Sequence, residues 1–198
     1  QRLAQELFFQ LSARSIVRMS NTDDTKLIER CRSGDRQAFE ALLVKYEKPV
    51  FNAAYRMLNS RDDASDITQT VFLKVFESFD QFDPTRRFFS WIYRITLNES
   101  INWLSKTNRM EPLAFEAADE RKGPEQEVDS ARASQDVQAA LMTMKTDYRS
   151  VVILKHFLGC SYTEISQILD VPEKKVKSRL YTARQQLKDA LTGKHQWQ

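Results

Sequence analysis

Apolar residues recur three or four positions apart through most of this chain, and this spacing restricts the fold more than any other feature of the sequence. Leu27, Ile28 and Cys31 show the spacing near the start, and Val137 and Leu141 show it again downstream. A period near 3.6 places such residues on one face of an α-helix. Only 4 glycines and 5 prolines occur among 198 residues, and no strand-like alternation stands out. The sequence therefore predicts an all-α protein.

Short motifs divide the first half of the chain into successive helices. Ser33 and Gly34 end the first helical pattern, and Pro49 predicts a boundary between the second pattern and the third. Ser60, followed three positions later by Asp63, is typical of a capped helix start. The helix that begins there is predicted to bury five apolar residues: Ile67, Val71, Phe72, Val75 and Phe76.

A long helix rich in aromatic residues is predicted after the chain break at Asp83-Pro84. Its apolar period runs from Phe88 to about Lys106. Aromatic residues at helical spacing usually belong to a core. We therefore expect most of the following residues to be buried: Phe89, Trp91, Ile92, Ile95 and Trp103.

A change of composition after this helix predicts two small helical domains joined by a flexible linker. Residues 110–129 hold two prolines, one glycine and seven acidic side chains, a mixture that disfavours a packed core. We expect an N-terminal extension at 1–21, a first domain at 22–109, a linker at 110–130, a second domain at 131–192 and a tail at 193–198. Met19 resembles a natural start, so the first eighteen residues are expected to be dispensable, although Leu3, Leu7 and Leu11 also suit a short amphipathic helix.

Several classes of protein lack support in the sequence. No apolar run approaches the roughly 20 residues that span a bilayer, and no signal-peptide pattern opens the chain, so we expect a cytoplasmic protein. Cys31 and Cys160 have no partners at metal-ligand spacing, which argues against a disulfide framework or a zinc site. His156 and His195 lack the neighbours of a catalytic centre, and no glycine-rich phosphate loop occurs. We expect neither enzymatic activity nor a cofactor.

Two adjacent helices near the C-terminus have the features of a helix-turn-helix. Ser161 and Glu164 form a capping box at the start of the first helix, Asp170 and Val171 suit a short turn, and Pro172 suits the next helix start. The second helix turns apolar residues inward and leaves a polar and basic surface: Lys174, Lys175, Lys177, Ser178, Tyr181, Thr182 and Arg184. A recognition helix has this layout. The alternative is a helical hairpin with a solvated basic face. The positions of the capping box and of the turn disfavour this alternative.

Four segments resemble the extracytoplasmic-function (ECF) sigma factors of the sigma-70 family. Residues 162–169 (YTEISQIL) and 176–184 (VKSRLYTAR) are similar to the domain of that family that reads the minus-thirty-five element. Residues 63–75 (DASDITQTVFLKV) resemble its helix that binds core RNA polymerase, and residues 89–98 (FSWIYRITLN) resemble its promoter-melting segment. These segments occur in the family's order, within a resemblance that covers roughly residues 24–191.

The resemblance implies a role for each of these surfaces. The core-polymerase-binding residues would be Asp62, Asp63, Asp66, Gln69 and Thr70. Contacts to minus-ten DNA would come from Arg86, Arg87, Arg94, Asn98, Lys106 and Arg109, with Arg86, Arg87 and Asn98 at the displaced strand and the others at phosphates. In the minus-thirty-five duplex, Lys177, Ser178 and Tyr181 would read bases or the groove. Lys174, Lys175, Arg179 and Arg184 would contact phosphate or support the helix.

Two positions depart from the family's pattern. Residues 63–66 read Asp-Ala-Ser-Asp, whereas the family usually has Asp-Ala-Glu-Asp, so Ser65 replaces a carboxylate on the helix that faces polymerase. Phosphorylation of Ser65, Thr68 or Thr70 by a regulatory kinase would restore negative charge. Thr182 stands where family members often carry Arg, so the minus-thirty-five preference should differ in detail.

The resulting prediction is a sigma factor whose partners are core RNA polymerase and promoter DNA. The family also suggests an anti-sigma factor, which no residue here indicates directly. The alternative is a helix-turn-helix regulator that binds duplex DNA without polymerase. Such a regulator would need a dimerisation element or an effector pocket in place of the motifs in the first domain.

Overall fold

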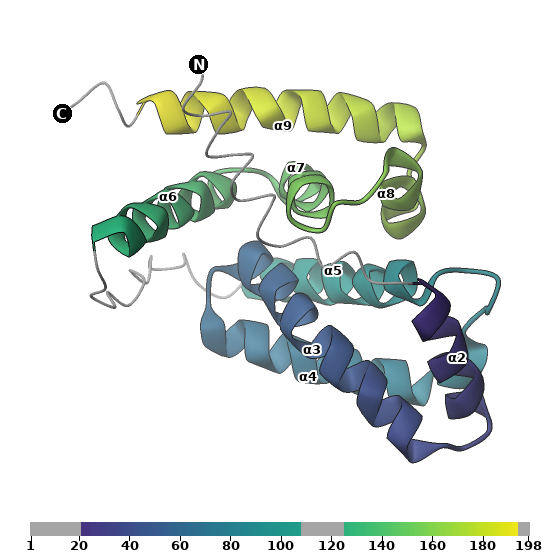
Figure 1. The fold of residues 1–198 in the computed structure, drawn as a ribbon. Helices are drawn as coiled ribbons and strands as arrows, with labels where there is room; N and C mark the ends of the chain where they lie inside the picture. The colour runs from purple at the N-terminus through teal and green to yellow at the C-terminus, as the bar shows by residue number, and fades with distance from the viewer. Residues whose placement is uncertain (1–20, 108–124, 194–198) are drawn as a thin grey trace. The chain divides into compact units, whose positions relative to one another are not determined.

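The computed structural model describes residues 21–107 and 125–193, which form the greater part of two compact units. Every regular element in these ranges is helical, which confirms the predicted fold class (Figure 1). The first unit contains α2 (Asn21–Arg32), α3 (Arg36–Leu58), α4 (Arg61–Glu77), a 3-10 turn (Phe79–Gln81) and α5 (Phe88–Thr107). The second contains α6 (Glu125–Met142), α7 (Thr146–Val152), a π-helical turn (Ile153–Phe157), α8 (Tyr162–Leu169) and α9 (Glu173–Gly193).

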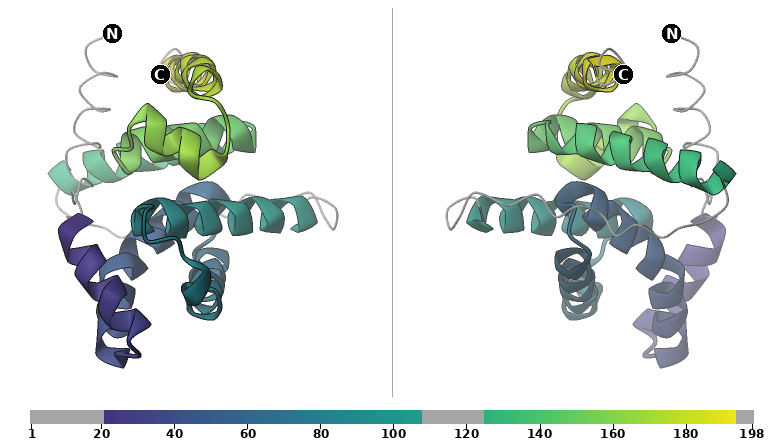
Figure 2. Two further views of the ribbon diagram at one scale, coloured as in Figure 1. Left: turned by 90° about the vertical axis from the view of Figure 1, so that its right-hand side faces the viewer. Right: turned by 90° about the vertical axis from the view of Figure 1, so that its left-hand side faces the viewer.

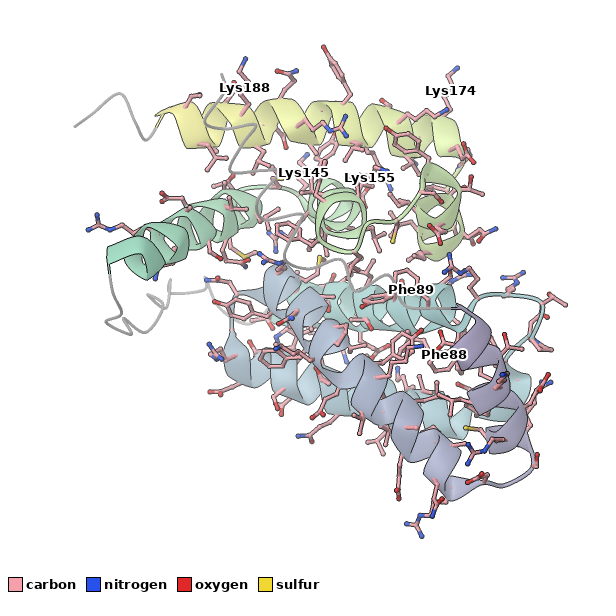
Figure 3. The ribbon with its side chains drawn as sticks, in the orientation of Figure 1. Phe88, Phe89, Lys145, Lys155, Lys174 and Lys188 are labelled. Carbon is pink, nitrogen blue, oxygen red and sulfur yellow. The ribbon has the colours of Figure 1, made fainter. Side chains whose placement is uncertain are left out.

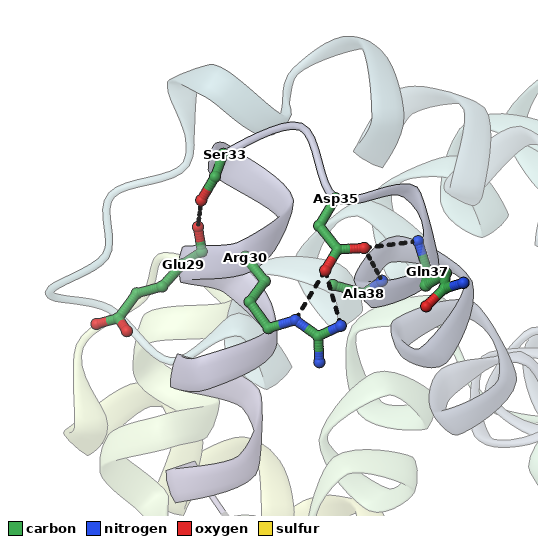
Figure 4. Close-up of polar contacts among 6 residues, drawn as sticks. All are labelled: Glu29, Arg30, Ser33, Asp35, Gln37 and Ala38. Atoms are coloured by element: carbon green, nitrogen blue, oxygen red, sulfur yellow. Dashed lines mark hydrogen bonds and ion pairs between the residues drawn. The ribbon is translucent and has the colours of Figure 1, made fainter.

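Within the first unit, α3 packs against α2, α4 and α5 (Figure 2). The predicted stop after α2 is confirmed, since Gly34 has a φ of +83° that glycine adopts at little cost. Asp35 then caps α3 by accepting hydrogen bonds from the amides of Gln37 at 2.9 Å and Ala38 at 3.2 Å (Figure 4). Arg30 donates to the same carboxylate at 2.8 Å, and this hydrogen bond is the main cause that lowers the pKa of Asp35.

The prediction that Pro49 separates two helices is wrong. Helix α3 continues through Pro49 for its full length, from Arg36 to Leu58. Proline in a helix interior removes one backbone hydrogen bond and crowds the preceding turn. Tyr46 and Val50, on either side of Pro49, are fully buried. Ala53 and Ala54 are no more than 2% exposed. Burial of this continuous apolar face outweighs the local cost of the proline.

The corner between α3 and α4 forms as the sequence predicted. Asn59 ends α3 in the left-handed conformation, with φ at 60°, and its amide donates to the carbonyl of Tyr55. Ser60 follows at once as the N-cap of α4, where its hydroxyl accepts a hydrogen bond from the amide of Asp63 at 3.2 Å.

Aromatic rings cluster where α5 begins and anchor that helix in the core of the first unit. Phe88 is 2% exposed, and its ring centroid lies 5.2 Å from that of Tyr46 and 5.7 Å from that of Phe82. Trp91 lies 4.9 Å from Phe82. Of the five α5 residues expected mostly in the core, only Ile92 is fully buried, and Phe89, Trp91, Ile95 and Trp103 are half-buried.

A buried polar network ties α2 to α3. Asp24 is only 2% exposed and accepts hydrogen bonds from the hydroxyl of Tyr46 at 2.7 Å and from Nζ of Lys45 at 2.6 Å. Burial, together with the bond to Asp24, raises the pKa of Tyr46 well above its usual range. The two donors compensate a carboxylate that would otherwise be costly to bury.

In the second unit, α9 packs along α7 and contacts α6. Arg149 of α7 is 6% exposed. Its guanidinium donates hydrogen bonds to the carbonyls of Leu141, Met142 and Met144, and these bonds cap the C-terminal end of α6. Helix α6 begins at Glu125, inside the range 110–130 expected to be linker, and α9 extends over 21 residues.

Some predictions concern residues outside the described ranges, namely the extension, the linker up to residue 124, Arg109, His195 and most of the tail. No described helix has an apolar stretch of the length and hydropathy needed to cross a membrane.

Candidate nucleic-acid and partner interfaces

The capping box at the start of α8 forms as predicted. The amide of Ser161 donates to Oε2 of Glu164 at 2.8 Å, and the amide of Glu164 donates to Oγ of Ser161 at 3.2 Å. The hydroxyl of Ser161 donates in turn to the same carboxylate at 2.9 Å. Because these bonds satisfy exposed amides at the helix start, they fix where α8 begins.

Side-chain hydrogen bonds also fix the turn between α8 and α9. Asp170 adopts a φ of 54°, which reverses the chain direction. Ser166 donates to the carbonyl of Val171 at 2.6 Å, and Thr163 of α8 donates to Glu173 of α9 at 2.6 Å. The angle between the two helices is thus held by polar bonds as well as by the apolar contacts of Ile165 and Ile168, which are buried.

Pro172 lies one position before α9, where its carbonyl accepts hydrogen bonds from the amides of Lys175 at 2.8 Å and Val176 at 3.1 Å. The proline starts the helix as predicted, and its missing amide proton leaves no helical bond unmade.

Helix α9 divides into a buried face and an exposed polar face, as the sequence predicted. The buried residues are Val176, Leu180, Ala183 and Leu187. Six of the predicted promoter-contacting residues are exposed: Lys174, Lys175, Lys177, Ser178, Tyr181 and Arg184. Thr182 and Arg179 are half-buried. Lys174 and Lys188 project from the side of α9 that faces away from α7 and α8 (Figure 3).

Lys188 is a candidate contact that our sequence reasoning missed. It follows Lys174 by fourteen positions, with Tyr181 halfway between, and this spacing places all three residues close to one face of a helix. The i, i+7, i+14 spacing was the signal that could have identified it. Lys188 is exposed.

Arg179 has a structural partner. Its guanidinium forms an ion pair with Asp147 in the first turn of α7, and only 16% of its side chain is exposed. Of the two roles predicted for Arg179, phosphate contact or support of the helix, this geometry favours support.

Arg184 contacts His156 of the π-helical turn. Its Nε lies 3.4 Å from Nε2 of His156, which accepts the hydrogen bond. Burial lowers the pKa of His156 to about 4, and the positive charges of Arg184 and Lys155 act in the same direction. His156 is therefore neutral near pH 7, as acceptance of this bond requires.

On α4, the predicted partner-binding residues lie on the surface. Asp62, Asp66 and Gln69 are exposed, whereas Asp63 and Thr70 are half-buried. Ile67, Val71 and Val75 form the buried face, as expected. Spacings of three and four residues place the exposed side chains along one line on the helix.

The same line continues into two exposed apolar residues. Leu73 is 63% exposed and Phe76 is 67% exposed. The prediction that Phe76 points inward is wrong, because most of its side chain is exposed and its ring meets that of Phe39 edge-on, with the centroids 5.3 Å apart. Large apolar side chains left in water beside a polar stripe are typical of a protein interface. We define Asp62, Asp66, Gln69, Leu73 and Phe76 as the α4 stripe.

The three residues considered for phosphorylation differ in accessibility. Ser65 is half-buried and lines a pocket of about 300 Å³ with Lys48, Glu47, Phe51, Thr68 and Gln69. Thr68 is 7% exposed, and its hydroxyl donates to the backbone carbonyl of Ala64 at 2.6 Å. The hydroxyl of Thr70 donates to the backbone carbonyl of Asp66 at 2.8 Å. Ser65 is the position with most room for a phosphate.

The loop before α5 displays the two arginines predicted to meet single-stranded DNA. Arg86 and Arg87 are exposed, and Arg86 lies 3.5 Å from Asp83. Asp83 accepts hydrogen bonds from both the amide and the hydroxyl of Thr85, at 2.9 and 2.7 Å, and these bonds order the loop. Arg32 of α2 holds the preceding segment by donating to the carbonyl of Phe82 at 2.9 Å.

Phe89 is a further candidate on this surface. Phe88 and Phe89 leave α5 in different directions, and Phe88 is buried in the aromatic core (Figure 3). The guanidinium of Arg87 lies 5.9 Å from the centroid of the Phe89 ring, and the rings of Phe89 and Tyr93 are 4.6 Å apart.

Asn98 and Lys106, farther along the helix, are exposed. Arg94 lies one turn before Asn98.

The described parts of the chain contain no cluster of three His, Cys, Asp or Glu side chains that could hold a metal ion. Both cysteines are free thiols: Cys160 is buried and Cys31 is half-buried. Burial raises the pKa of Cys31.

Comparison with known proteins identifies the family. Residues 42–110 match the model for Sigma-70 region 2, and residues 134–187 match the model for Sigma-70, region 4. The ECF RNA polymerase sigma factor SigW of Bacillus subtilis is 31% identical over 179 residues, which cover 84% of this chain and 95% of SigW. The chain belongs to the ECF sigma factors. Another relative, the ECF RNA polymerase sigma-E factor of Escherichia coli, is 32% identical to this chain, and the matched region covers 91% of its length.

Solved structures support the same assignment for this sigma factor. The structure of CnrH in complex with the cytosolic domain of CnrY matches with a TM-score of 0.67 at 25% identity, over 86% of this chain and 98% of CnrH. The sigma factor RpoE of Bartonella quintana, solved with the anti-sigma factor NepR, has the same fold, with a TM-score of 0.62 at 23% identity. As a sigma factor, the protein directs promoter-specific transcription with RNA polymerase, and the alternative of a polymerase-independent regulator is not favoured.

Proposed function

We propose that this sigma factor binds core RNA polymerase through the α4 stripe, reads the minus-thirty-five duplex with α9 and holds the displaced minus-ten strand beside α5. The continuous exposed stripe on α4 is the observation that carries this proposal. It combines carboxylates, an amide and two apolar side chains on a single helix face. Charged residues would set the register and rate of association, and the apolar end would supply buried area.

The exposed face of α9 suits a major groove. Lys174, Lys175 and Arg184 can neutralise phosphates, which strengthens binding to any sequence. Lys177, Ser178 and Tyr181 lie among them and are placed to meet base edges. Thr182 offers a short hydroxyl where the resembling proteins often carry Arg, so a different base preference is expected there.

The surface around the start of α5 suits an opened strand. Arg86 and Arg87 supply cations, and Phe89 supplies an aromatic face on which an extruded base can stack. Asn98 can bond a base edge, while Arg94, Lys106 and Arg109 are assigned to phosphates. The aromatic core behind Phe88 keeps this surface rigid.

A protein partner would regulate these surfaces. CnrH and the RpoE of Bartonella quintana were each solved with another protein, CnrY and the anti-sigma factor NepR respectively. By analogy, an anti-sigma factor would occlude the α4 stripe of this chain. The protein would act without enzymatic activity of its own, in the cytoplasm where polymerase and DNA meet.

Phosphorylation of Ser65 by a kinase is a second level of control. A phosphate at Ser65 would restore the negative charge that the family usually carries at this position. It would also enter the pocket that Lys48 and Glu47 line, where Lys48 can form an ion pair with it while the Glu47 carboxylate opposes it. Ser65→Ala should then impair core binding in cells, and full activity of Ser65→Ala would remove the support for this switch.

The decisive experiment is transcription in vitro with core polymerase that lacks its own sigma factor, on a library of genomic fragments. With the protein present, new start sites should appear downstream of two shared and regularly spaced elements. Absence of initiation despite core binding would point to a missing modification. Absence of core binding would contradict the role of the α4 stripe.

A further inference from the structure

Two lysines converge on the ring of Tyr162 in the second unit. The ammonium of Lys155 lies 4.9 Å from the ring centroid, and that of Lys177 lies 5.6 Å from it. Both distances fall within the range of cation–π attraction. Lys155 belongs to the π-helical turn (Figure 3), Tyr162 is the first residue of α8 and Lys177 lies on α9.

Tyr162 and Lys155 are each fixed by other contacts. Tyr162 directly follows Ser161, whose capping box sets the first turn of α8. Lys155 donates a hydrogen bond to the carbonyl of Cys160 at 3.0 Å and is half-buried. The ring is therefore a fixed platform beside the exposed face of α9.

Lys177, in contrast, is exposed, and within the described ranges no carboxylate lies at ion-pair distance from it. An unrestrained lysine side chain samples many rotamers, which it must give up when it meets a base. Attraction to the ring restricts Lys177 before DNA arrives. Repulsion from Lys155, whose ammonium lies at the same ring, disfavours rotamers of Lys177 that bring the two ammonium groups together.

We propose that Tyr162 is a positioning residue for promoter recognition, because it holds Lys177 ready to donate to an acceptor edge in the major groove, such as O6 and N7 of guanine. This inference rests on the proposed role of Lys177 as a base-reading residue. Tyr162 itself need not touch DNA. The expected contribution is about two- to fivefold in preference for the matching base, the range of an exposed cation–π contact.

The test uses holoenzyme assembled from the full chain and core polymerase. A promoter found by the transcription experiment is prepared as a duplex pool with a randomised upstream element, and bound sequences are counted. Four variants are compared with the unaltered protein: Tyr162→Phe, Tyr162→Leu, Lys177→Ala and the Leu/Ala double variant. Thermal unfolding of each variant identifies any loss of fold. Replacement of Tyr162 by pentafluorophenylalanine keeps the ring's shape while it removes the negative face.

We expect Tyr162→Leu and the fluorinated ring to weaken the same base preference that Lys177→Ala removes, by about two- to fivefold. Tyr162→Phe should keep the preference, and the double variant should match Lys177→Ala alone. If Lys177→Ala shifts the base preference but the fluorinated ring does not, the positioning role fails while the proposed function stands. The same conclusion follows if the losses of preference in Tyr162→Leu and Lys177→Ala simply add in the double variant. Tighter binding by Tyr162→Leu would also overturn it, since the ring would then sequester Lys177. If Lys177→Ala leaves the preference unchanged, both ideas fail.

Discussion

Arg184 of α9 donates a hydrogen bond to His156 of the π-helical turn, with Nε and Nε2 3.4 Å apart. His156 must be neutral to accept this bond, and its pKa of about 4 keeps it so at neutral pH. Protonation would place a third positive charge beside Arg184 and Lys155. The state of this histidine therefore couples pH to the stability of the second unit.

The free energy of unfolding should fall as the pH is lowered from about 6.5 to about 4. The pKa of His156 is lower in the folded chain than in the unfolded chain, so the unfolded chain binds the proton more tightly in this window. We expect His156 to account for a loss of about 1–2 kcal/mol after allowance for solvent screening. Urea titrations across this range would measure it. His156→Gln should have a shallower pH dependence, and an unchanged slope would contradict this account.

Tyr46→Phe should destabilise the first unit. The substitution removes the hydroxyl that donates to buried Asp24 at 2.7 Å and leaves the hydrogen bond from Lys45 to this carboxylate. We expect a loss of about 1–3 kcal/mol in the free energy of unfolding. Tyr181→Phe is the matched control, because Tyr181 is 68% exposed and should change stability by less than about 0.5 kcal/mol. Equal effects of the two substitutions would show that the Asp24 bond contributes little.

Leu73→Ala should weaken binding to core polymerase without loss of stability. Leu73 is 63% exposed, so its truncation should change the free energy of unfolding by less than about 0.5 kcal/mol. If its side chain is buried on binding, affinity should fall about five- to tenfold, as for a moderate interface residue. Competition against a labelled sigma factor for core polymerase would measure this. Val44→Ala is the control, since Val44 is 78% exposed on α3 outside the α4 stripe, and its affinity should not change.

Lys174→Ala and Lys177→Ala should separate phosphate contact from base reading. Loss of a phosphate contact at Lys174 should weaken binding to every promoter alike and reduce the salt slope, the steepness with which log affinity falls with log salt, by about 1. Lys177→Ala should instead change which upstream sequences are preferred. Binding to a set of promoters at several salt concentrations would distinguish them. Uniform loss for Lys177→Ala would contradict its assignment.

Local chemistry predicted the helix boundaries well where side chains close hydrogen bonds with nearby amides. The starts of α4 and α8 depend on Ser60 and on the pair Ser161 and Glu164, and each bond spans only three residues. Such bonds can be inferred from sequence because both partners are visible within one turn.

The errors arose where distant packing decided the outcome. Pro49 remains inside α3 because the residues around it are buried against other helices, which the local pattern cannot show. Phe76 fits the apolar period of α4 yet is exposed, whereas Phe79, just after the end of the helix, is buried and contacts Phe39. The apolar period identified the helix, while the available core volume decided which members of the period were buried.

The corner at Asn59 and Ser60 has a consequence for how the α4 stripe can evolve. Because α3 ends at Leu58 and α4 begins at Arg61, the chain has no slack with which to absorb a change of length. One residue inserted into the first turn of α4 would rotate everything after it by about 100° relative to the rest of the unit. Such an insertion would turn Gln69 and Leu73 together out of line with Asp62, while every side chain of the stripe was still encoded. Natural variation in this protein should therefore include substitutions along the stripe more often than a change of chain length at this corner.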